Sequence, residues 1–130
     1  MSIENTRETL MKYFNSEHGD VSVMSLGVVF TDMATGQQFK GPDAILAMLN
    51  YFYHHAFNAT ADLTNMVIEG NRAMTEWDFV GTHTGEFAGV PATGKQVRVP
   101  LAIAYDLENN KIRSARIYFQ IPAFLRQVGA

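Results

Sequence analysis

The chain has 130 residues, a net charge of −3 at pH 7 and no cysteine. This length fits a single domain that buries a core without disulfides, and thiolate metal sites are excluded. There is no basic run that would follow a phosphate backbone, and no apolar run approaches the ~20 residues of a membrane span, so we expect no nucleic-acid or membrane partner. The N-terminal sequence lacks the apolar segment of a signal peptide, and a cytoplasmic location fits.

The first half of the chain predicts two helices separated by a β-rich segment. Ser2 is a suitable N-cap for the first helix, and Pro42 occupies the first position of the second. Gly36 ends a turn between two extended stretches. We expect helices at residues 3–15 and 42–57, and strands at residues 21–32 and 37–39.

The second half predicts a long antiparallel meander that ends in a short helix opened by Pro122. Gly70-Asn71 and residues 108–110 are tight-turn signals between strands. Apolar residues alternate without interruption from Val97 to Leu107, so one face of that strand is buried. Helices followed by a meander indicate an α+β domain, whose curved, mostly antiparallel sheet wraps around the helices and leaves a conical pocket. The strands are expected at residues 59–69, 73–86, 96–107 and 111–121.

Three stretches of the chain carry a family resemblance. They are GDVSVMSLGVVFTDMATGQQFKGPDAI, EGNRAMTEWDFVGTHTGEFAGVPATGKQVRVP and KIRSARIYFQIPAFLRQVG. They resemble the SnoaL-like polyketide cyclases, which belong to the nuclear-transport-factor-like cone fold together with ketosteroid isomerase, scytalone dehydratase and limonene epoxide hydrolase. The resemblance extends from about Asp20 to Gly129.

The resemblance implies a small, often dimeric protein whose pocket takes an apolar, polyketide-like or cyclic carbonyl molecule without metal or cofactor. Cyclases of this family close a ring by aldol condensation, and an Asp near the end of the last long strand is their acid/base group. Counted back from Arg126-Gln127, this position holds Gln120. An amide does not gain or lose a proton near neutral pH, so the chain departs from the family pattern there.

The last strand carries a polar stripe. Side chains alternate along a strand, so Arg116, Tyr118 and Gln120 share one face, and the resemblance turns that face toward the cavity. There they are expected to bind and polarise a ligand carbonyl or carboxylate. The alternative is a satisfied network in which Arg116 pairs with Glu76 or Asp78 on a neighbouring strand.

His83 and Asp32 are the candidate acid/base groups. An imidazole changes charge near neutral pH, but the alternative for His83 is a structural bond to Thr82, Thr84 or the backbone of its loop. Asp32 follows an apolar run, where a half-buried carboxylate at a cavity mouth acts as a base. The alternative for Asp32 is to cap the turn at residues 33–36.

Aromatic side chains are expected to line the pocket beside Glu76. The four histidines lack the spacing of a metal site, so no metal is expected. An Asp–Arg–Asp set for epoxide hydrolysis, made of Asp32, Arg116 and Asp78, is a further option within the enzyme hypothesis. The candidate lining residues are Phe39, Tyr51, Tyr53, Trp77 and Phe79.

Two functions remain open from the sequence. The first is a cofactor-independent lyase, isomerase or cyclase for a small apolar carbonyl compound. The second is a binding protein without catalysis, which Gln120 favours. A homodimer is compatible with either function, and Ile117, Phe119 and the apolar face of residues 97–107 are expected to form its interface.

Overall fold

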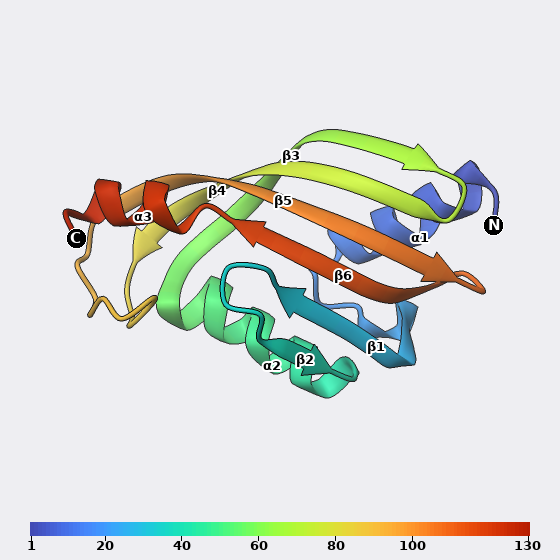
Figure 1. The fold of residues 1–130 in the computed structure, drawn as a ribbon, viewed down its shortest axis with the longest axis horizontal. Helices are drawn as coiled ribbons and strands as arrows, with labels where there is room; N and C mark the ends of the chain where they lie inside the picture. Colours follow the sequence, from blue (N-terminus) through green and yellow to red (C-terminus); the bar gives the residue numbers. More distant parts are fainter.

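The computed structural model describes all residues, 1–130. The helices predicted at residues 3–15 and from Pro42 are confirmed, although the second ends in a wider π-helical turn. The elements in chain order are α1 (Ile3–Asn15), the 3-10 turn η1 (Val21–Val23), β1 (Met24–Asp32), β2 (Gln38–Lys40), α2 (Pro42–Tyr51), the π turn η2 (Phe52–Ala56), β3 (Phe57–Glu69), β4 (Arg72–His83), β5 (Gln96–Glu108), β6 (Lys111–Phe119) and α3 (Ile121–Val128) (Figure 1).

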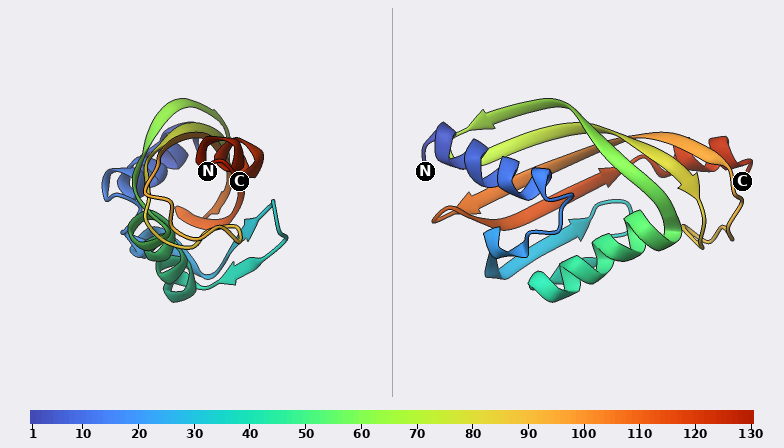
Figure 2. Two further views of the ribbon diagram at one scale, coloured as in Figure 1. Left: turned by 90° about the vertical axis from the view of Figure 1, so that its left-hand side faces the viewer. Right: turned by 180° about the vertical axis from the view of Figure 1, so that it is seen from behind.

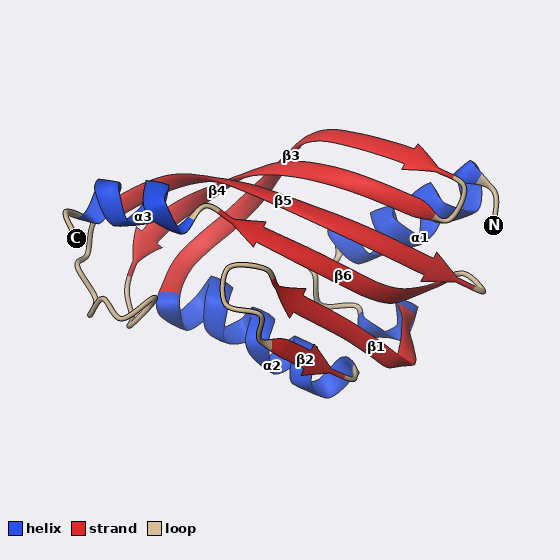
Figure 3. Ribbon diagram, viewed as in Figure 1, coloured by secondary structure: helices blue, strands red, loops and turns tan.

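All six strands form one curved sheet in the order β2-β1-β6-β5-β4-β3. The pairing of β1 with β6 is parallel, and the other pairings are antiparallel. The sheet curls but does not close into a barrel, and α1 and α2 lie on its inner side (Figure 2). Helix α3 lies at one end of the sheet, beyond the end of β6 (Figure 3). The α+β class and the curved, mostly antiparallel sheet are confirmed.

Helix α1 is held at its start by a cap and in its middle by the sheet. The Asn5 N–H donates to Ser2 Oγ at 3.0 Å, which satisfies one of the free amides of the first turn. Thr6 Oγ1 donates to the Gly70 carbonyl at 2.6 Å, so the helix is fastened to the β3–β4 turn. Leu10 and Tyr13 point into the core and are fully buried.

The loop after β4 clamps the end of the π turn η2. The backbone N–H groups of Thr84 and Gly85 both donate to the Ala56 carbonyl at 3.0 Å. Thr84 Oγ1 donates to the His55 carbonyl at 2.9 Å. A Cβ atom on Gly85 would overlap this His55 carbonyl oxygen, so the close approach of the two backbones requires glycine.

Replacing Gly85 with Ala is therefore expected to lower the free energy of unfolding by about 1–3 kcal/mol, as overpacking does elsewhere. Gly27→Ala is the matched control, because nothing lies within 4 Å of a Cβ atom there. Urea unfolding of the two variants and the parent measures both values. Equal loss in the two variants would mean that the contact with His55 does not matter.

The face of β6 that points into the interior is the opposite of the one that we expected. Leu107 pairs with Ile112 and Asp106 pairs with Ser114, so Arg113 is an extra residue in β6. Such a bulge shifts the alternation by one position. Ile112 is buried before the bulge and Ala115 after it, and from there the odd-numbered residues face inward.

The surface expected for a homodimer is consequently wrong. Ile117 and Phe119 lie on the inner face, where Phe119 is buried. The alternating residues from Val97 to Leu107 are also buried in the core. The outer face of the sheet instead exposes Met74 and Tyr118.

Candidate functional site

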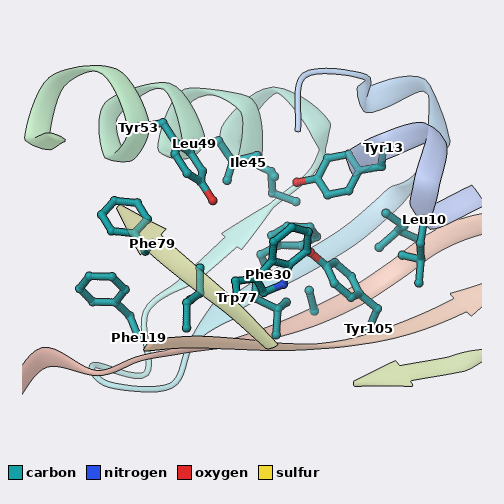
Figure 4. Packing of buried hydrophobic residues seen from close by; sticks show 14 of the residues in the cluster. Leu10, Tyr13, Phe30, Ile45, Leu49, Tyr53, Trp77, Phe79, Tyr105 and Phe119 are labelled. Atoms are coloured by element: carbon teal, nitrogen blue, oxygen red, sulfur yellow. The ribbon is translucent and has the colours of Figure 1, made fainter. Parts of the chain in front are cut away.

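A cavity of about 220 Å³ opens between the inner face of the sheet and α2, and 12 of its 14 lining residues are hydrophobic. Strands β5 and β6 form one wall, and α2 with η2 forms the other. Figure 4 shows Leu49 and Tyr53 on the helical side facing Phe79 and Phe119 on the sheet. The lining residues are Asp32, Gln37, Phe39, Met48, Leu49, Tyr51, Phe52, Tyr53, Phe87, Leu101, Ile103, Ile117, Phe119 and Ile121.

Three consecutive aromatic residues line the cavity where α2 passes into the π turn: Tyr51 ends α2, and Phe52 and Tyr53 begin the turn. A π turn is wider than an α turn and is frequent at functional sites. The Phe52 ring stacks on Phe79 at a centroid distance of 4.6 Å and meets Phe119 edge-on at 5.2 Å. These contacts hold the helical wall against the sheet at one end of the cavity.

Asp32 contributes the only carboxylate among the cavity-lining residues. It ends β1 and is half-buried. Its Oδ1 accepts the Ala34 N–H at 2.9 Å, which confirms that it caps the turn at residues 33–36. The cap uses one carboxylate oxygen, so the same side chain both holds the turn and lines the cavity. Gln37 is the neighbouring polar residue.

His83 is not among the residues that line the cavity. It is fully buried in the core, with the ring of Phe124 edge-on at a centroid distance of 5.0 Å. Its Nδ1 lies 2.9 Å from Thr93 Oγ1, and its backbone bonds Gly94 and Lys95. The expectation that His83 holds its loop is confirmed, through Thr93 rather than Thr82 or Thr84.

The polar stripe expected inside the cavity is on the outer face of the sheet. Because of the bulge in β6, Arg116 is half-buried there and Tyr118 is exposed. Gln120 is exposed just after β6, and Glu76 is exposed on β4. None of the four lines the cavity. Their predicted place in a ligand pocket is therefore wrong.

Arg116 pairs with Asp106 and not with Glu76 or Asp78. Arg116 Nη1 donates to Asp106 Oδ2 at 2.7 Å, and Ser114 Oγ donates to the same oxygen at 2.9 Å. Burial works against the charge of Asp106, but these hydrogen bonds and the nearby cations outweigh it, so its pKa is below the usual value. This is a structural ion pair on the outer face.

The set of groups considered for epoxide hydrolysis is not assembled. Asp78 forms an exposed ion pair with Arg98 at 3.3 Å, and Arg116 forms its ion pair with Asp106. Only Asp32 of that set lines the cavity. The epoxide hydrolase option is therefore wrong for this arrangement of side chains.

Of the expected aromatic lining, Phe39, Tyr51 and Tyr53 line the cavity, whereas Trp77 and Phe79 do not. Trp77 is buried beside the cavity wall, and its Nε1 donates to Thr75 Oγ1 at 2.8 Å. The sequence reasoning missed the apolar wall of Leu101, Ile103, Ile117 and Phe119. The unbroken alternation of apolar residues on β5 was the signal for Leu101 and Ile103.

A buried polar cluster, which the sequence reasoning also missed, adjoins the cavity. It comprises Tyr13, Tyr53, Tyr105 and His18, and Figure 4 shows the three phenol oxygens directed toward the same interior space. Burial raises the pKa of each phenol, and the neighbouring phenols raise those of Tyr13 and Tyr105 further. Burial also lowers the pKa of His18 to about 4, and its ring stacks on Tyr53 at 5.6 Å.

The fold contains neither a membrane-spanning helix nor a cluster of metal-binding side chains. The helices are all too short or too polar to cross a bilayer. No three His, Asp or Glu side chains gather in a way that would hold a metal ion.

Solved structures similar to this one share its fold along nearly the whole chain. A SnoaL-like protein from Jannaschia sp. CCS1 superposes with a TM-score of 0.87 and 21% identity, covering 100% of this chain and 96% of its own. TsrD from Streptomyces laurentii has a TM-score of 0.77 and 20% identity, covering 98% and 95%. IdmH from Streptomyces antibioticus has a TM-score of 0.76 and 21% identity, covering 100% of both chains. These neighbours have the nuclear-transport-factor-like cone fold.

No curated protein matches the sequence. The family model for SnoaL-like polyketide cyclases, however, matches residues 17–128, which include every lining residue of the cavity. The resemblance seen in the sequence motifs therefore extends over most of the chain, and the protein belongs to the SnoaL-like polyketide cyclase family.

Proposed function

We propose that this protein binds a small, mostly apolar molecule in the cavity and converts it by acid/base chemistry without a cofactor. The observation that carries the proposal is the Asp32 carboxylate at the edge of an otherwise hydrophobic cavity. The substrate class is a cyclic or polyketide-like carbonyl compound, in keeping with the family. The reaction class is an isomerisation, a ring closure or an elimination.

Asp32 is suited to take a proton from a carbon atom next to a ligand carbonyl. A positioned carboxylate contributes about 10²–10⁴-fold to such a step when it reaches the proton. Asp32 Oδ1 is held by the Ala34 N–H, so the carboxylate has a fixed orientation at the cavity edge. A ligand that fills the hydrophobic cavity would displace water from the side of the carboxylate that it contacts, which strengthens the interaction with a reacting group.

Filling the cavity tests whether the ligand binds there. Ile117→Trp adds a large side chain to the wall, and we expect the affinity for the hydrocarbon tetralin to fall by about tenfold or more, since the core has little room to adjust. Tyr118→Trp is the matched control, because the adjacent residue lies on the outer face of the same strand. Calorimetric titration of both variants gives the affinities. Equal binding by parent and Ile117→Trp, or no binding by the parent, would contradict the proposal.

A binding protein without catalysis is the second candidate. By the resemblance, the family's acid/base position holds Gln120, an amide that cannot transfer a proton near neutral pH, and this side chain is exposed outside the cavity. This candidate requires that carbonyl compounds leave the cavity unchanged. Mass analysis of a polyketide-like ketone library before and after incubation distinguishes the two, because an isomerised or dehydrated product would refute a purely binding role.

That the protein is a cytoplasmic homodimer also stays a prediction. Light scattering of the purified protein would measure its oligomeric state. Fractionation of cells would show the compartment in which it is found.

A further inference from the structure

Two buried polar atoms of the cluster next to the cavity have no hydrogen-bond partner. They are Tyr105 Oη and His18 Nε2. A buried polar group left without a partner costs about 1–3 kcal/mol, so such atoms call for an explanation. Each lies in a cluster with Tyr13 and Tyr53 rather than alone among aliphatic side chains.

The cluster adjoins the cavity through Tyr53, whereas its other three members do not line the cavity. Tyr53 belongs to both, because it lines the cavity and also stacks on the imidazole of His18. Ile103 lines the cavity, and Tyr105 follows it on the same inward face of β5. The unpartnered phenol of Tyr105 is thus one side-chain position deeper than the cavity wall, and Figure 4 shows it on the side toward Tyr13 and Tyr53.

The backbone has an uncommon conformation at His18, the residue that contributes the imidazole of this cluster. Glu17 and His18 have φ angles of 57° and 61°, in the left-handed region that non-glycine residues seldom adopt. His18 is nevertheless buried, with Trp77 at a ring distance of 5.4 Å. The chain therefore places a polar ring in the core in spite of unfavourable backbone geometry and desolvation.

We propose that this cluster is the subsite for one oxygen atom of the ligand, which accepts a hydrogen bond from Tyr105 Oη and lies against Tyr53. This inference rests on the proposed function and narrows its substrate class to neutral ketones and quinones whose oxygen enters the cavity first. The apolar body of the ligand then lies between the π turn and strands β5 and β6, with its other end toward Asp32.

The charge state of the cluster selects a neutral oxygen. Burial raises the pKa of Tyr105 and Tyr53, so both phenols keep their protons at neutral pH and are donors. Burial lowers the pKa of His18 to about 4, so its ring is uncharged at neutral pH. A carboxylate would meet no cation there and would lose its hydration, which is costly, whereas a carbonyl oxygen needs only a donor.

A pair of probes that differ in one oxygen tests the subsite. The probes are 1-tetralone and its hydrocarbon counterpart tetralin, titrated into the parent, Tyr105→Phe and the control Tyr118→Phe. In the parent and the control we expect the ketone to bind about five- to tenfold more tightly than the hydrocarbon, the value of one neutral hydrogen bond. We expect Tyr105→Phe to remove this preference and to leave the affinity for tetralin unchanged. The free energy of unfolding of the free protein should not fall, because the hydroxyl that is removed has no hydrogen-bond partner there.

The infrared carbonyl stretch of bound 1-tetralone provides a readout that a purely structural role would not move. A hydrogen bond lowers this frequency, so the band of the parent complex lies below that of the Tyr105→Phe complex. Tyr53→Phe serves as a second variant and is expected to give a smaller change in the same direction.

The outcomes separate this inference from the proposed function. If both probes bind the parent equally and the band does not move, the cluster holds only water, and the subsite is refuted while the apolar cavity stands. If Tyr105→Phe weakens both probes alike, the phenol shapes the cavity and does not hold the oxygen, which also refutes the subsite. If neither probe binds the parent, the proposed function is refuted as well.

Discussion

Replacing Asp32 with Asn is expected to lower the turnover of a converted ligand by about 100-fold or more, the usual contribution of a positioned general base. The substitution removes the proton acceptor but keeps an oxygen that can accept the Ala34 N–H. The turn after β1 is therefore preserved, and ligand affinity and the free energy of unfolding should change little. Loss of turnover with unchanged affinity identifies a group that acts in the reaction rather than in the fold.

The matched control for this experiment is Asp62→Asn. Asp62 is an exposed carboxylate on β3 and does not line the cavity. Steady-state rates and calorimetric affinities are measured for both variants over the same pH range. Full turnover in Asp32→Asn would place the acid/base group elsewhere and contradict the proposed role of this carboxylate.

Acidification from pH 7 to pH 4.5 is expected to destabilise the protein by about 2 kcal/mol through His18 alone. Burial lowers the pKa of His18 to about 4 in the folded protein, whereas an unfolded histidine has a pKa of about 6.5. Between these values the unfolded chain binds more protons than the folded one, so stability falls as the pH falls. The loss begins near pH 6.5 and levels off below pH 4, at about 3 kcal/mol.

The variant His18→Asn isolates this contribution. Asn tolerates the left-handed backbone conformation at this position, and its side chain does not titrate between pH 4 and pH 7. Urea unfolding at a series of pH values should therefore give a shallower slope for the variant than for the parent between pH 6.5 and pH 4.5. Parallel slopes would show that the imidazole is hydrated or protonated in the folded protein.

The local elements were predictable because their signals are local. Ser2 and Pro42 mark helix starts, and the Asn109-Asn110 pair, with φ angles of 52° and 61°, makes the expected tight turn between β5 and β6. The cap that Asp32 makes for the turn after β1 was also predictable, because an Asp before a turn bonds the backbone amides that follow it.

The site was less predictable because it depends on register. Strict alternation put Arg116 and Gln120 on one face, which the resemblance turned toward the cavity, but the extra residue Arg113 in β6 reversed the two faces. An inserted residue leaves no mark in the pattern of a short strand, since its position is set by pairing with the neighbouring strand. The family motif around His83 likewise holds a loop through Thr93, a contact that joins residues ten positions apart.

By itself, the amino-acid sequence determined the fold class, the family and most element boundaries, because periodicity, caps and turns act over a few residues. The tertiary structure alone decided which face of β6 looks inward and which polar groups meet at the cavity. It also decided that Tyr13, Tyr53, Tyr105 and His18 share one buried space. These residues come from three distant parts of the chain, and only the curling of the sheet around α1 and α2 brings them together.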